Sequence, residues 1–150
     1  MDHLDLYLVT GLLVIFGLLE AMTGVWGRGK RRLDDWLIDI IAVSQFAFLI
    51  KPAVVFLVSY LLLNLAPQYQ GALSGMAFWP ALLLVILPDD LMHYWYHRLA
   101  HQNHRFWLWH RTHHTTPTYQ ISIAFRENWL WLTFLPGIRY GALMVYLGLG

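Results

Sequence analysis

The amino-acid sequence predicts an all-α membrane protein, with several helices that cross the bilayer and a histidine-rich helical segment at one end. Three observations predict this fold. The chain is 58% hydrophobic, with a mean hydropathy of +0.48, whereas soluble domains are roughly 45–50% apolar. Apolar stretches alternate with short polar turns. Six of the eight histidines lie in the single segment from His97 to His114.

Size, charge and cysteine content exclude several classes of protein. The chain has 150 residues, which is the size of one domain. Its formal net charge is only +1, so we expect no nucleic-acid partner. Cysteine is absent, which excludes disulfides, thiolate metal ligands and cysteine nucleophiles. Any metal ion in this protein is therefore held by nitrogen and oxygen atoms.

The first apolar stretch covers residues 6–26. At about 1.5 Å per helical residue it is long enough to cross a hydrocarbon core of about 30 Å. Residues 1–7 are acidic, unlike the basic start of a cleavable signal peptide, so we expect a retained membrane helix. The segment after it is typical of a cytoplasmic loop because it contains four basic residues, Arg28, Lys30, Arg31 and Arg32.

Three more apolar stretches follow, at residues 37–66, 76–88 and 129–150. Pro52 predicts either one kinked span in the second stretch or an interfacial helix followed by a shorter span. Arginines precede this stretch and recur in the histidine region, and both basic segments are expected on the cytoplasmic face. This favours the single span, because one crossing at residues 37–66 and one at 76–88 return the chain to that face. Residues 89–116 form the histidine-box region. The end of the chain lacks a charged or aromatic anchor, so we expect residues 1–150 to be a single, truncated membrane domain.

The histidine spacing predicts two helical faces. On a helix that turns about 100° per residue, four side chains fall within about 80° of one another: Asp90, His93, His97 and His101. His97 and His101, four residues apart, can grip one metal ion. His110, His113 and His114 share a second face, which does not align with the first along an unbroken helix. We therefore expect a break at residues 102–105, with the two faces turned toward each other.

The histidines offer more ligand atoms than one metal ion needs. The expected metal ligands are His97, His101, His110, His113 and His114; further candidates, as ligands or as groups that orient a ligand, are Asp90, His93 and His104. Imidazole and carboxylate donors suit iron, zinc, manganese or copper. Their number fits two ions, or one ion with outer histidines. The alternative is an aromatic and basic belt at the membrane interface, but such belts do not favour histidine.

The histidines form two patterns, HRLAH at residues 97–101 and HRTHH at residues 110–114, and YWYHR with Asp90 leads into the first. In this order and spacing they resemble the first two histidine boxes, HxxxH and HxxHH, of the fatty acid hydroxylase/sterol desaturase superfamily. The segment through Arg126 resembles the alkylglycerol monooxygenase-like branch of that family. The resemblance covers roughly residues 81–131. The family's third box is absent, because no histidine follows His114.

This resemblance implies a membrane-bound, iron-dependent oxygenase that hydroxylates or desaturates a lipid such as a sterol, fatty acid or alkylglycerol. It implies two iron ions in the complete protein, held by the box histidines, with no catalytic residue beyond the ligands and with Asp90 orienting a ligand. The implied partners are the lipid, O2, the bilayer and an external electron donor, because nothing here resembles a flavin or nicotinamide site. The boxes are expected on the cytoplasmic side of a multi-pass protein, in a bacterial inner membrane or the endoplasmic reticulum.

Three alternatives remain open at the level of sequence. An inactive fragment is one, because the family's third box supplies ligands to the di-iron site. A membrane protein that binds or transports metal without oxygen chemistry is another, although transport sites usually lie on the spans near the bilayer midplane. A bis-histidine haem protein is the third, but it needs single histidines on facing helices rather than HxxHH.

Overall fold

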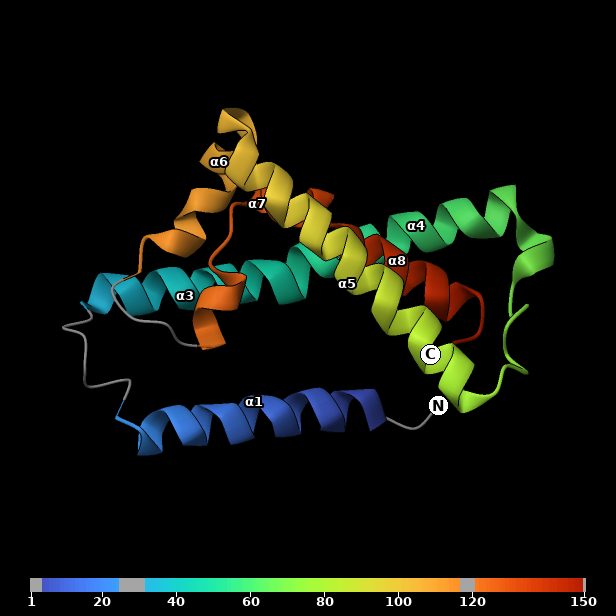
Figure 1. Cartoon of the computed structure of the whole chain (residues 1–150), viewed down its shortest axis with the longest axis horizontal. Helices are drawn as coiled ribbons and strands as arrows, with labels where there is room; N and C mark the ends of the chain where they lie inside the picture. Colours follow the sequence, from blue (N-terminus) through green and yellow to red (C-terminus); the bar gives the residue numbers. More distant parts are fainter. Residues whose placement is uncertain (1–3, 25–31, 117–120, 150) are drawn as a thin grey trace.

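A computed structural model describes residues 4–24, 32–116 and 121–149 of the chain (Figure 1). This described part is built of helices and turns without a strand, so the predicted all-α class is confirmed. Its α-helices are α1 (Leu4–Met22), α3 (Leu33–Gln45), α4 (Lys51–Leu65), α5 (Phe78–Gln102), α6 (His104–His110), α7 (Trp129–Phe134) and α8 (Pro136–Tyr146). Shorter elements are the π-helical turn η1 (Phe46–Ile50) and the 3₁₀ turns η2 (Pro67–Tyr69), η3 (Arg111–His114) and η4 (Ile121–Phe125).

One continuous helix of 33 residues runs from Leu33 to Leu65 through α3, η1 and α4. In η1, the N–H of Lys51 donates to the carbonyl of Phe46, five residues earlier. Pro52 follows directly and has no N–H to donate, and the wider π turn lets the helix continue past it. Within the described ranges this is the one helix long and apolar enough to cross a membrane. This one helix covers residues 37–65 of the stretch predicted as a single kinked span, and all four predicted crossings stay predictions.

The helix α5 joins the apolar stretch 76–88 to the first histidine box, and it passes through Pro88 without ending. Proline cannot donate to the carbonyl four residues earlier, which here belongs to Leu84. The hydroxyl of Tyr140, on α8, donates to that carbonyl instead. An unpaired carbonyl is costly in an apolar environment, so Tyr140 replaces the hydrogen bond that the proline removes.

The stretch predicted as a last span, residues 129–150, differs in the structure because it is divided between α7 and α8. Leu135 separates them in an extended conformation (φ −58°, ψ 120°), and Pro136 begins α8. A residue before proline avoids the helical conformation, which accounts for the division. With 6 and 11 residues respectively, neither helix reaches about 30 Å at about 1.5 Å per residue.

The packing places a small core directly behind the histidines. α8 packs against α4 and α5, while α6 and α7 gather at the C-terminal end of α5. α1 lies next to η4, on the side of α3 opposite α6 (Figure 1). The buried core consists of Ile50, Val54, Ala100, Trp131 and Leu132. Many large apolar side chains on the outer faces are exposed, among them Phe48, Phe56 and Trp79, which is the surface expected of helices that face lipid.

Candidate metal centre

A sharp break between α5 and α6 brings the two histidine boxes together. α5 ends at Gln102, and Asn103 adopts an extended conformation (φ −122°, ψ 121°). The side-chain oxygen of Asn103 accepts from the N–H of Arg105 at 3.0 Å, so this asparagine caps α6. The break predicted at residues 102–105 is therefore confirmed.

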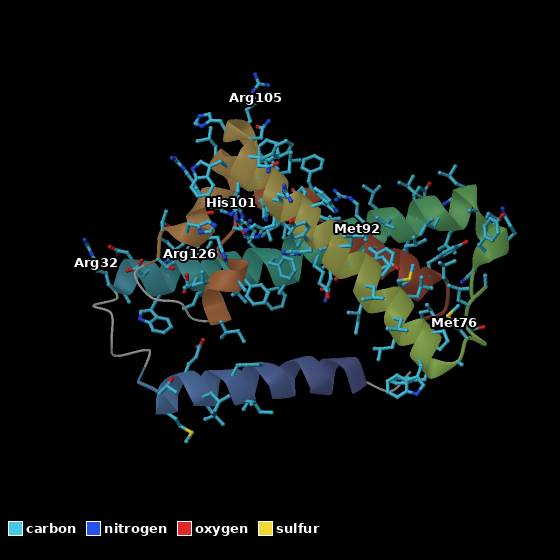
Figure 2. The ribbon with its side chains drawn as sticks, in the orientation of Figure 1. Arg32, Met76, Met92, His101, Arg105 and Arg126 are labelled. Carbon is cyan, nitrogen blue, oxygen red and sulfur yellow. The ribbon has the colours of Figure 1, made fainter. Side chains whose placement is uncertain are left out.

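Four histidines converge across this break. One ring nitrogen from each of His97, His101, His110 and His114 lies within 4.8 Å of the others. Both boxes contribute an i, i+4 pair: the Nε2 atoms of His97 and His101 are 2.9 Å apart, and those of His110 and His114 are 3.1 Å apart. Ring nitrogens gather around His101 in Figure 2. The structure thus brings together four of the five predicted ligands.

The protonation of these rings fits a metal ion. Burial, reinforced by the neighbouring imidazoles, lowers the pKa of His97 and of His110 to about 4. Burial and the same neighbours also lower the pKa of His114. Neutral imidazole is the form that binds metal, so at neutral pH these rings offer lone pairs without releasing a proton. Four nitrogen donors at this spacing suit a transition metal.

The cluster is enclosed on one side and open on the other. His110 is buried, with 1% of its surface exposed, and its ring packs 4.6 Å from that of Trp131 in the core. His101 and His114 are exposed, with the ring of Trp107 beside them at 5.2 and 5.3 Å. An ion among the four rings would therefore meet packed protein on the His110 side and an accessible edge on the other.

His113, the fifth predicted ligand, lies beside the cluster, with its ring 5.5 Å from that of His110. Its Nδ1 lies 3.0 Å from the backbone carbonyl of Ile123. A carbonyl only accepts, so Nδ1 donates in this contact. His113 is not part of the group of four, and its role as a ligand stays a prediction.

A cavity of about 260 Å³ lies beside the cluster. Its polar wall consists of His93, His97, His110, His113 and Glu127, and its apolar wall of Ala124, Trp131, Leu132 and Leu135. The cavity therefore places apolar surface next to the nitrogen donors, which is the combination that a mostly hydrocarbon ligand requires.

The three further candidates occupy different positions. His93 lines the cavity, and its ring is 6.4 Å from that of His97. His104 begins α6 and is exposed. Asp90 is also exposed, and within the described residues no hydrogen bond or ion pair joins it to a histidine. The predicted roles of these three residues stay predictions.

Glu127 contacts the cluster although the sequence patterns do not include it. Its Oε1 lies 2.9 Å from Nδ1 of His110, and the two side chains are 6% and 2% exposed. The distance is within hydrogen-bonding range, but Nδ1 has no assigned hydrogen-bond partner among the described atoms. Burial raises the pKa of Glu127 to about 8. No spacing rule links residue 127 to a histidine, so only tertiary structure reveals this contact.

The neighbouring residue, Arg126, anchors the same segment to the long helix. Arg126 is buried, with 4% of its surface exposed. Its Nε donates to Oδ1 of Asp39 at 2.7 Å, and its terminal nitrogen donates to the carbonyl of Asp35 at 2.8 Å. Asp39 is itself 2% exposed. The segment that carries Glu127 is therefore fixed by a buried ion pair.

Comparison with known proteins finds a local similarity. The chain is 33% identical over 58 residues to alkylglycerol monooxygenase from Xenopus tropicalis, which is 35% of this chain and 13% of that protein. It is 36% identical over 52 residues to the enzyme from Homo sapiens (31% and 12%), and 36% over 55 residues to that from Danio rerio (37% and 11%). The chain thus matches only about a tenth of the length of these relatives.

No family model matches the chain. No solved structure matches it either. The similarity agrees with the branch that the sequence resembles, and it supports the superfamily at this coarse level.

Proposed function

We propose that this chain is part of a membrane-bound, iron-dependent oxygenase that acts on a lipid. The observation that carries the proposal is the convergence of four imidazoles within 4.8 Å, next to a cavity with an apolar wall. The local similarity to alkylglycerol monooxygenases supports the same reaction class and an alkylglycerol-type lipid among the candidate substrates.

In this proposal His97, His101, His110 and His114 hold the metal ion, and His113 and His93 stand beside the adjoining cavity. Bound iron would supply the reaction with O2 that side-chain chemistry cannot, because an unactivated C–H bond resists acids and bases at neutral pH. Imidazoles suit this location, since neutral ligands cost less than carboxylates near lipid.

The protein's own contribution is positioning. Trp131, Leu132 and Leu135 form the apolar wall that would receive the hydrocarbon part of the lipid and exclude water from the cluster. The exposed edge at His101 and His114 leaves the site accessible to a separate electron donor. The cytoplasmic orientation is part of this proposal. It rests on basic residues, of which Arg28, Lys30 and Arg31 lie outside the described part of the chain.

Turnover tests the proposal. The full chain is placed in lipid nanodiscs, loaded anaerobically with Fe²⁺, and given a chemical reductant, O2 and a panel of alkylglycerols, fatty acids and sterols. We expect O2 uptake and an oxidised lipid detected by mass spectrometry, with both lost in His110→Ala and kept in His104→Ala. Tight iron binding without lipid oxidation would contradict the oxygenase proposal and favour a metal-binding protein without oxygen chemistry.

A further inference from the structure

We propose that Glu127 is a positioning residue, which holds the His110 ring so that its Nε2 faces the metal and its proton stays on Nδ1. The inference rests on the proposed function, because it assigns a role in the same metal centre. It assigns to Glu127 the task that the sequence predicted for Asp90.

The two nitrogens of the His110 ring face different partners. Nε2 faces the cluster, 3.1 Å from Nε2 of His114, and Nδ1 faces Glu127 at 2.9 Å. A histidine that binds metal through one nitrogen usually donates its other ring N–H to a carboxylate or carbonyl, which fixes both tautomer and orientation. Contacts of this kind are often poorly aligned before the ligand is present and tighten when it binds.

A purely structural role does not account for a glutamate at this position. The side chain of Glu127 is 6% exposed, and its second oxygen, Oε2, is buried without a hydrogen-bond partner among the described residues. A buried polar atom left unpaired costs about 1–3 kcal/mol, whereas leucine would fill a similar volume without this cost. A group that destabilises the fold where it stands is typical of a functional site.

The same segment orients a second histidine. The carbonyl of Ile123 faces Nδ1 of His113 at 3.0 Å, as Glu127 faces Nδ1 of His110. Residues 123–127 thus approach two rings of the second box from the Nδ1 side, and Arg126 fixes this segment to α3. By contrast Asp90 is exposed and makes no such contact in the described structure.

Metal affinity provides the first test. Co²⁺ binding to the full chain in detergent micelles is measured by competition with a chelator, for wild type, Glu127→Leu, Glu127→Gln and the matched exposed carboxylate Asp90→Leu. We expect Glu127→Leu to weaken binding about 10–100-fold, which is typical of losing an outer partner of a ligand. Glu127→Gln should stay within about threefold, because the amide oxygen still accepts from Nδ1–H. Asp90→Leu should match wild type.

Metal-free protein provides the second test, which does not depend on whether iron chemistry occurs. At about pH 9, where the Glu127 carboxylate can only accept, ¹⁵N NMR of the His110 ring should show the proton on Nδ1 in wild type and a mixture of tautomers in Glu127→Leu. Should the leucine variant fail to fold, Glu127→Ala with and without added acetate gives the same comparison, because acetate can replace the missing carboxylate.

Three results would overturn the inference. One is a Glu127→Leu protein with wild-type affinity and a wild-type tautomer. Another is an equal loss in Glu127→Gln and Glu127→Leu with fewer ions bound per chain, which would make Glu127 a direct ligand. The third is a loss in Asp90→Leu as large as that in Glu127→Leu. Wild-type protein that binds no metal but has His110 fixed as the Nδ1–H tautomer would refute the proposed function and leave the positioning role supported.

Discussion

Arg126 donates from Nε to the carboxylate of Asp39 at 2.7 Å, and both side chains are almost completely buried. The pair connects the segment that contacts the histidines with the long helix that is the candidate membrane span. Because Glu127 follows Arg126 directly, the ion pair also sets the position of the carboxyl group beside His110. The buried ion pair therefore fixes the candidate metal centre to the candidate span.

Removal of one member of this ion pair should strongly destabilise the protein. Arg126→Met removes a buried charge that donates to Asp39 and to Asp35, and breaking a buried ion pair costs about 3–5 kcal/mol. Replacement of the two most buried partners, Arg126→Met with Asp39→Leu, should recover part of that loss because the buried Asp39 carboxylate is removed as well. Chemical unfolding in micelles measures both values.

The exposed residue Arg105, which projects from the outer end of the histidine region (Figure 2), provides the control. Arg105→Met should change the free energy of unfolding by less than about 0.5 kcal/mol. A double variant no more stable than Arg126→Met alone would contradict this description of the ion pair.

The stability of the metal-free protein should fall as the pH rises above neutrality. In the unfolded chain Glu127 loses its proton near the ordinary value of 4.5, whereas in the folded protein its pKa is about 8. Between about pH 7.5 and about pH 9 the folded state therefore binds more protons than the unfolded state, and the free energy of unfolding should decrease by about 1 kcal/mol. Unfolding curves at the two pH values measure this change.

Glu127→Gln isolates the contribution of this one group, because glutamine does not titrate. The free energy of unfolding should fall between these two pH values in wild type and stay constant in Glu127→Gln. The histidines with lowered pKa act at lower pH, since His97 and His110 stay neutral in the folded state down to about 4. Parallel curves for the two proteins would show that Glu127 is already ionised in the fold.

The hydrogen bond from Tyr140 to Leu84 should be needed only because Pro88 cannot make one. Tyr140→Phe leaves the Leu84 carbonyl without this donor and should cost about 1 kcal/mol. In a Pro88→Ala background the alanine N–H can donate to the same carbonyl, so Tyr140→Phe should then cost much less. A double-mutant cycle from thermal unfolding measures the coupling, and equal costs in the two backgrounds would rule out this explanation.

Local spacing predicted the parts of the site that depend on a single helix. His97 and His101 are an i, i+4 pair on α5, and helical geometry alone puts them on one face. His110 and His114 have the same spacing across the junction of α6 and η3. The break at residues 102–105 followed because the two faces could not meet otherwise, and Asn103 supplies the cap that makes it. The charge pattern favoured a single span across residues 37–66, and one continuous helix covers residues 37–65 of it.

Contacts between distant segments were outside the reach of such rules. The contacts of Glu127 with His110 and of Arg126 with Asp39 depend on how η4 and α7 pack against α3 and α6. His113 shares a helical face with His110 in the sequence pattern, yet its Nδ1 contacts the carbonyl of Ile123, and no spacing rule predicts that contact. Pro136 divides residues 129–150 after Leu135, and a hydropathy pattern does not register the effect of a proline on the backbone.

The most direct test of the central claim is anaerobic Fe²⁺ binding to the full chain, with His110→Ala compared to His104→Ala. Both variants remove one imidazole from α6, but only His110 belongs to the converging group. We predict that His110→Ala weakens binding by more than about 100-fold, beyond the effect of losing an outer partner, and that His104→Ala binds like wild type. Equal binding by the two variants would contradict the assignment of these four histidines as a metal centre.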